Sequence, residues 1–196
     1  MTTKQFNYFS FCTRERKSSI GQEKYLSGVH HRNGYKYASN GFIFLRTKSE
    51  YDKALEEQCL LKNGKILPNI EKYRRINFDC LIIEDEKIKK EYNSIKIDFI
   101  KINEIEKQYK IDKKITEDTI EFYGAFYISF ENRVNISLKE FLKFIKAMKY
   151  YNIDTLYVHK TEIKPLWCSK ENTFLIIMPT SIKCDWVPNC KIYKYE

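Results

Sequence analysis

The chain has 196 residues, of which 43% are hydrophobic and 15% aromatic, so it can bury the core of one sizeable domain, residues 1–196. Its formal net charge of +9 permits an acidic partner such as a nucleic acid, although a lysine-rich composition also produces such a charge without any partner. The N-terminus lacks the apolar region of a secretory signal, and no apolar stretch approaches the roughly 20 residues of a membrane helix. We therefore expect a cytoplasmic protein with no membrane partner.

Three β-like runs alternate with two Asn-Gly pairs at the front of the chain. The runs cover residues 25–31, 35–39 and 42–48, and the Asn-Gly pairs are residues 33–34 and 40–41. Asn and Gly both accept positive φ, so each pair is a strong signal for a hairpin turn. The sequence therefore predicts an antiparallel meander of three strands.

The middle of the chain has weaker patterns. Residues 49–61 fit either a short helix or a surface excursion, and we treat residues 49–94 as an extended middle segment. Residues 94–99 have the pattern of a strand. Residues 99–114 place apolar side chains on one helical face and lysines on another, which predicts an amphipathic helix. Its lysines are Lys107, Lys110 and Lys114.

The strongest helical pattern lies at residues 135–151. Its apolar stripe consists of Leu138, Phe141, Leu142, Ile145 and Met148. Ser137 is the expected N-cap, with Glu140 in the capping-box position. On the opposite side Lys139, Lys143 and Lys146 recur at i, i+4 and i+7, in a row about 10 Å long.

Three further strands are predicted after this helix, at residues 154–160, 163–169 and 173–179. Before it, the aromatic run 119–130 predicts a hairpin or a bulge around Gly124, whose rings either pack in the core or stack on a single-stranded nucleic acid. The fold class is α+β, with helices on one face of an antiparallel sheet. Residues 183–196 form a short C-terminal tail.

The six cysteines contain no Cys-x-x-Cys motif, which favours reduced thiols in a reducing compartment. A bridge between Cys184 and Cys190 is the alternative.

No phosphate-binding loop, dinucleotide fingerprint, zinc-protease motif or nucleophile elbow is present, so we expect no enzyme, no cofactor and no metal site. His30 and His31 are adjacent, and neighbouring residues on a strand point to opposite faces. The acidic run 84–86 fits a solvated turn better than a metal site, and His159 stands alone on its strand.

Two groups of short motifs carry a resemblance to a known family. The closing segment combines a helix and three strands with Lys164-Pro165-Leu166 and Ile177-Met178-Pro179. The front contains Leu26-Ser27-Gly28-Val29 and Ala38-Ser39-Asn40-Gly41-Phe42. These segments, at about 25–48 and 120–182, resemble a domain of the bacterial DNA polymerase sliding clamp (beta clamp). Asn40 and Phe42 replace the usual Asp and His, and the terminal Arg of true clamps is missing.

The resemblance implies a single clamp-like domain of the phage or mobile-element type, built from two βαβββ halves. It further implies a non-enzymatic protein of DNA replication that binds double-stranded DNA without sequence preference, or a replication partner, and that forms homo-oligomers. The implied DNA-binding residues are the helix lysines Lys107, Lys110, Lys114, Lys139, Lys143 and Lys146. The implied partner-binding residues are Leu166, Met178, Pro179 and Ile182; the alternative is an ordinary strand end with Met178 in the core.

Two alternatives remain open at this point. One is a small interaction protein that inhibits or decoys a host replication or defence complex. The other is an RNA-binding module.

Overall fold

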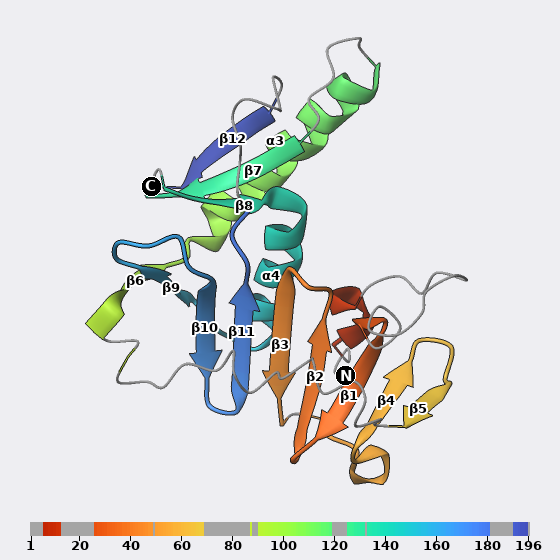
Figure 1. The fold of residues 1–196 in the computed structure, drawn as a ribbon. Helices are drawn as coiled ribbons and strands as arrows, with labels where there is room; N and C mark the ends of the chain where they lie inside the picture. The colour runs from red at the N-terminus through yellow and green to blue at the C-terminus, as the bar shows by residue number, and fades with distance from the viewer. Residues whose placement is uncertain are drawn as a thin grey trace.

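The computed structural model describes residues 6–12, 26–48, 50–68, 87, 90–118, 125–131, 133–180 and 190–195. Within these residues the fold is α+β, with two sheets and two α-helices (Figure 1). The large sheet has nine strands in the order β5-β4-β1-β2-β3-β11-β10-β9-β6, and all its pairings are antiparallel. The small sheet has the order β12-β7-β8.

The strands of the large sheet are β1 (Gly28–Arg32), β2 (Tyr35–Ser39), β3 (Ile43–Thr47), β4 (Gln58–Leu61), β5 (Ile66–Pro68), β6 (Tyr92–Lys96), β9 (Thr155–His159), β10 (Leu166–Lys170) and β11 (Thr173–Ile177). The small sheet comprises β7 (Ala125–Phe130), β8 (Val134–Ser137) and β12 (Cys190–Tyr195). The helices are α3 (Phe99–Asp118) and α4 (Leu138–Tyr150), with 3-10 turns η1 (Tyr8–Phe11) and η2 (Lys53–Leu55).

The predicted meander is confirmed, the three strands predicted after the helix form a second one, and the two join into one sheet. Strands β1-β2-β3 form the first meander and β9-β10-β11 the second. The meanders meet where β3 pairs antiparallel with β11, from Ile43 opposite Ile177 to Thr47 opposite Thr173. The large sheet therefore repeats the same strand arrangement on either side of this central pair.

The two Asn-Gly pairs form different turns. Asn33 and Gly34 both have positive φ, 52° and 72°, which is the geometry of a two-residue type I′ hairpin. In the second turn the side chain of Asn40 determines the geometry. Its Oδ1 accepts the backbone N–H groups of Phe42 and Ile43, both at 2.9 Å, as in an Asx turn.

Gly28 is required by a close approach between neighbouring strands. A Cβ at this position would lie 2.4 Å from Cys59 Sγ and 2.9 Å from the carbonyl oxygen of Leu60. Both distances are shorter than real side-chain contacts, so only glycine allows β1 to pair with β4 at this distance.

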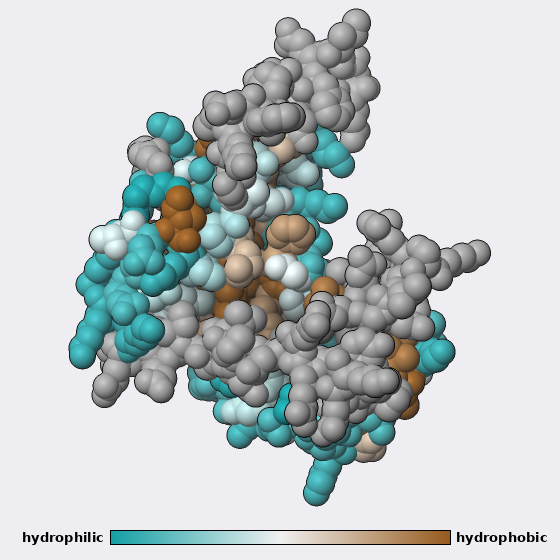
Figure 2. Space-filling model, in the orientation of Figure 1, coloured by the Kyte–Doolittle hydropathy of each residue, from teal (hydrophilic) through white to brown (hydrophobic). Residues whose placement is uncertain are grey.

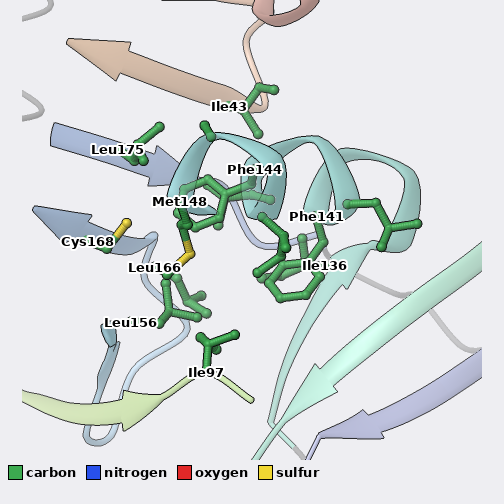
Figure 3. Close-up of a cluster of buried hydrophobic side chains, with 14 of the residues drawn as sticks. Ile43, Ile97, Ile136, Phe141, Phe144, Met148, Leu156, Leu166, Cys168 and Leu175 are labelled. Carbon is green, nitrogen blue, oxygen red and sulfur yellow. The ribbon is translucent and has the colours of Figure 1, made fainter. Parts of the chain in front are cut away.

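The main core lies between the large sheet, α4 and the small sheet (Figure 3). As predicted, α4 buries Phe141 and Ile145. Its buried face contacts Leu175 and Leu166 on the large-sheet side and Ile136 on the small-sheet side. Helix α4 is thus the element that joins the two sheets.

The opposite face of the large sheet holds a second, aromatic cluster. Its buried members are Tyr37, Phe44, Tyr92, Trp167, Phe174 and Ile176. Alternate residues of β11 belong to the two clusters, so this strand is buried on both faces. Burial on both faces explains why residues 174–177 are continuously apolar instead of alternating.

Helix α3 lies along the small sheet instead of covering the large one. Tyr109 contacts Phe126 of β7, with ring centroids 5.1 Å apart. Asp112, which is buried, accepts hydrogen bonds from Tyr193 and from Gln108 and forms an ion pair with Lys191. The expectation that the helices share one face of one sheet is therefore not confirmed: α4 lies between the sheets and α3 beside the small one.

The Asp112 network anchors β12 to α3. Burial by itself raises the pKa of Asp112, but the hydrogen bonds from Lys191, Tyr193 and Gln108 outweigh it and leave the pKa below its usual range. The carboxylate is therefore charged at neutral pH, and it holds residues 190–195 of the predicted C-terminal tail in a parallel pairing with β7.

Several local expectations need correction. Residues 58–61 form strand β4, although 49–61 was expected to be a helix or a surface excursion. Residues 134–137 form β8, so the helix begins at Leu138. Ser137 occupies the N-cap but makes no side-chain capping bond, and Glu140 is held instead by Asn40 and Lys143. These partners compete with the capping box for the Glu140 carboxylate.

Some expectations fall outside the described residues, including Gly124, the acidic run 84–86 and Cys184. Cys190 is a free cysteine, and the alternative bridge to Cys184 involves a residue outside the described ranges. No helix in the described ranges is long and apolar enough to cross a membrane.

Candidate functional site

The lysine face of α4 is the most basic helical surface in the described residues. The helix carries four lysines and one glutamate in 13 residues. Lys139 and Lys146 are exposed, and Lys143 is partly exposed. All three lie opposite the stripe of Phe141, Ile145 and Met148, because 3.6 residues complete a turn.

Each lysine of α4 has a different electrostatic environment. Lys143 is bound by the Glu140 carboxylate at 3.0 Å, and Glu140 is also held by Asn40 Nδ2 at 2.7 Å. Lys149 donates to Asn103 of α3 at 2.9 Å. Glu106 of α3 has a pKa below its usual value, first because of its hydrogen bond with Lys110 and then because of the charges of Lys146 and Lys149. Lys139 has no carboxylate within ion-pair distance among the described residues.

The second predicted lysine stripe lies on a helix without net charge. Lys107, Lys110 and Lys114 are exposed on α3. Lys110 pairs with Glu106 at 2.9 Å. Over its whole length α3 carries five lysines against five carboxylates, whereas α4 has a net charge of +3. The electrostatic attraction for a polyanion is therefore concentrated on α4.

The four predicted partner-binding residues do not form one exposed surface. Leu166 is completely buried in the main core. Met178 is exposed and Pro179 partly exposed, immediately after β11, and Ile182 lies outside the described residues. The structure therefore leaves Met178 and Pro179 as the accessible part of this predicted site.

An exposed residue that the sequence analysis did not select lies beside Met178. Phe42 is 55% exposed, and its carbonyl accepts the backbone N–H of Met178 at 2.7 Å. Phe42 directly precedes β3 and Met178 directly follows β11, and Figure 2 shows apolar surface in this region of the molecule. The two residues are far apart in the sequence, so no local pattern indicated that their backbones are paired.

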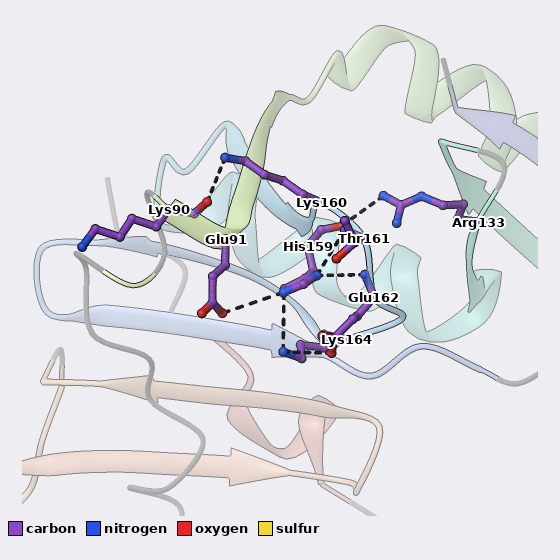
Figure 4. A network of polar contacts seen from close by, with 8 residues as sticks. All are labelled: Lys90, Glu91, Arg133, His159, Lys160, Thr161, Glu162 and Lys164. Carbon is purple, nitrogen blue, oxygen red and sulfur yellow. Dashed lines mark hydrogen bonds and ion pairs between the residues drawn. The ribbon is translucent and has the colours of Figure 1, made fainter.

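The surroundings of His159 indicate a role in holding the fold together (Figure 4). Its Nδ1 accepts the backbone N–H groups of Thr161 and Glu162 at 3.3 and 2.9 Å, so the hydrogen of the neutral ring is on Nε2. Nε2 lies 3.8 Å from the Glu91 carboxylate and 3.5 Å from Lys164 Nζ. The side chain is buried, and it fixes the loop between β9 and β10.

His31 is also buried, and it lies on β1, which is not a neighbour of the His159 strand β9 in the sheet. Its Nδ1 lies 3.2 Å from the carbonyl oxygen of Asp52, and burial is the main cause that lowers its pKa. In the described part of the chain no three His, Cys, Asp or Glu side chains are grouped to hold a metal ion.

Aromatic side chains form a stack across the outer face of the large sheet. Tyr157 lies flat on Trp167, with centroids 4.4 Å apart, and Trp167 stacks on Phe174 at 5.7 Å. The Arg46 guanidinium carbon lies 5.8 Å from the Phe174 ring centre and 4.5 Å from that of Tyr35. Trp167 Nε1 and Arg46 Nε are buried donors that have no hydrogen-bond partner among the described residues. The stack therefore packs aromatic rings together and leaves these two N–H groups unpaired.

Comparison with protein-family models, with curated proteins and with solved structures finds no significant match.

Proposed function

We propose that this protein is a non-enzymatic, clamp-like protein that binds the backbone of double-stranded DNA through the lysine face of α4. The observation that carries the proposal is the net charge of +3 on a 13-residue helix on which Lys139 and Lys146 are exposed and Lys143 is partly exposed. Phosphate contacts need charge and position but no base-reading geometry, so such a face is sufficient for binding without sequence preference.

The repeated strand arrangement of the large sheet adds support to the clamp-like assignment. Each half contains a three-stranded meander, as the resemblance to a sliding-clamp domain implies. Replication is accordingly the process that we propose, and a phage or mobile element is the proposed source. In this proposal α4 supplies the DNA contacts, and α3 contributes little because its lysines are balanced by carboxylates.

The test is a salt series of fluorescence anisotropy measurements with a labelled duplex. With three phosphate contacts, affinity should fall roughly six-fold for each doubling of salt concentration. Changing Lys139, Lys143 and Lys146 to Glu should abolish binding at about 50 mM salt, because the helix then repels phosphate. Exposed positions rarely affect stability much, so the fold should be retained.

A second triple variant controls for the overall charge. It changes three exposed lysines beside the edge strands β4 and β5, namely Lys53, Lys62 and Lys65. Changing them to Glu alters the net charge of the protein by the same amount. This control should keep most of the affinity. Equal loss in both variants would reject a specific role of α4, and absence of wild-type binding at low salt would reject the DNA-binding function.

A protein partner is the second candidate function, and the exposed pair Phe42 and Met178 favours it. The backbones of these two exposed apolar residues are paired, and contiguous exposed apolar surface is typical of interaction sites. The partner would be a replication protein, or a host complex that this protein inhibits. A clamp-binding peptide, titrated to millimolar concentration, should shift the amide NMR signals of Phe42 and Met178, and Phe42→Glu should suppress the shifts. Unchanged wild-type spectra would eliminate this candidate.

A further inference from the structure

The outer face of α3 exposes more apolar surface than a solvated helix requires. Ile100, Ile111 and Ile115 are 72%, 54% and 52% exposed, whereas Ile102 on the inner face is buried. The inner face is already occupied by contacts with the main core and with β7 and β12. Ile100 and Ile111 therefore take no part in the packing of this inner face.

Four exposed residues on this face of α3 follow the spacing of a helix-pairing seam. Ile100, Glu104, Lys107 and Ile111 follow one another at intervals of four, three and four residues. These are the intervals of a and d positions in a helix pair, so the four side chains form one seam. Read in either direction, the seam begins and ends with isoleucine and has two opposite charges at its centre.

We propose that α3 pairs antiparallel with α3 of a second copy of this chain. In the antiparallel register centred between Ile105 and Glu106, Ile100 meets Ile111 of the second copy and Glu104 meets Lys107 of the second copy. Twofold symmetry repeats each contact, which gives two apolar contacts and two ion pairs. Parallel pairing would oppose Glu104 to itself and Lys107 to itself, so the charge order selects the antiparallel arrangement.

The charge distribution also favours this face over others. Two chains with a net charge of +9 repel each other, but α3 carries five lysines and five carboxylates. Glu104 and Lys107 have no ion-pair partner among the described residues, so both remain available for intermolecular pairs. A second copy thus meets less repulsion at α3 than at the basic α4.

The size of the contact predicts a weak and reversible dimer. The seam from Ile100 to Ile111 is about 17 Å long at 1.5 Å per residue. Such a contact is smaller than the interfaces of permanent dimers, so the dimer should depend on protein concentration.

Sedimentation velocity over about 10 µM to about 1 mM protein tests the proposal. Wild type should shift from monomer toward dimer across this range. Glu104→Lys and Lys107→Glu should each raise the dissociation constant at least about ten-fold, because each change places like charges together in two symmetry-related pairs. The double variant Glu104→Lys/Lys107→Glu restores opposite charges and should restore the dimer.

Ile111→Glu and Ile163→Glu form a matched pair of further variants. Ile111→Glu should leave a monomer. Ile163 is 65% exposed on the loop between β9 and β10, and its change to Glu should leave the dimer intact. A wild type that stays monomeric throughout would overturn the proposal. A double variant that remains monomeric would overturn the antiparallel register. The inference is independent of DNA binding, since α4 is unchanged in all these variants.

Discussion

Replacing Phe141 by alanine should lower the free energy of unfolding by about 3–5 kcal/mol, as aromatic truncations in cores do. Phe141 is completely buried on α4, and its ring centroid lies 5.3 Å from that of Phe130 in the small sheet. It also stacks on Phe144 at 6.5 Å. Truncation would leave a cavity where α4 joins the two sheets, and the surrounding elements can close it only partly.

Urea unfolding followed by far-UV circular dichroism measures this loss. Lys139→Ala is the matched control, because it lies on the exposed face of the same helix and should change stability by less than about 0.5 kcal/mol. A loss below about 1 kcal/mol for Phe141→Ala would mean that this part of the core is not tightly packed.

The second large loss of stability is expected at Trp167. Two substitutions distinguish the contribution of its ring packing from that of its indole N–H. Trp167→Ala should cost about 3–5 kcal/mol, because the indole is 1% exposed and stacks on both Tyr157 and Phe174. Trp167→Phe should cost less than about 1 kcal/mol. Phenylalanine keeps a ring in the stack, and it removes an N–H whose burial without a partner costs about 1–3 kcal/mol.

The same unfolding measurement applies, with circular dichroism as the signal because both variants change the fluorescence. Ile163→Ala, on an exposed loop, should change stability by less than about 0.5 kcal/mol. If Trp167→Phe is as damaging as Trp167→Ala, the indole N–H makes a hydrogen bond that the fold needs, and the stack does not account for the stability.

The two proposed interactions use different helices and can be separated by mutation. Substitution of Lys139, Lys143 and Lys146 affects the α4 face, whereas substitution of Glu104 and Lys107 affects α3. A dimer would carry two α4 faces, so the affinity for long DNA should increase with protein concentration only if both proposals hold.

Turn chemistry and hydrophobic periodicity determined the local elements of this protein. Asn33 and Gly34 accept positive φ, and this property specified the first hairpin without information from elsewhere in the chain. The stripe from Leu138 to Met148 specified the buried face of α4, because residues three and four apart share a side of a helix. These interactions span few residues, so the sequence predicted them correctly.

The row of lysines in the candidate site was predictable from the sequence, but the contact that holds their Glu140 neighbour was not. Their spacing placed Lys139, Lys143 and Lys146 on one face. The ion pair of Lys143 with Glu140 is local, three residues apart on the helix, whereas the hydrogen bond from Asn40 that holds Glu140 joins residues 100 positions apart. The exposed pair of Phe42 and Met178 depends likewise on the pairing of β3 with β11.

The sequence by itself determined the α+β class, the two meanders and the amphipathic face of α4. Only the tertiary structure decided how these units combine. The pairing of β3 with β11, the parallel addition of β12 to β7 and the position of α3 beside the small sheet join segments far apart in the chain. A strand edge offers similar hydrogen-bonding groups to many partners, so its actual neighbour depends on which apolar faces can be buried together.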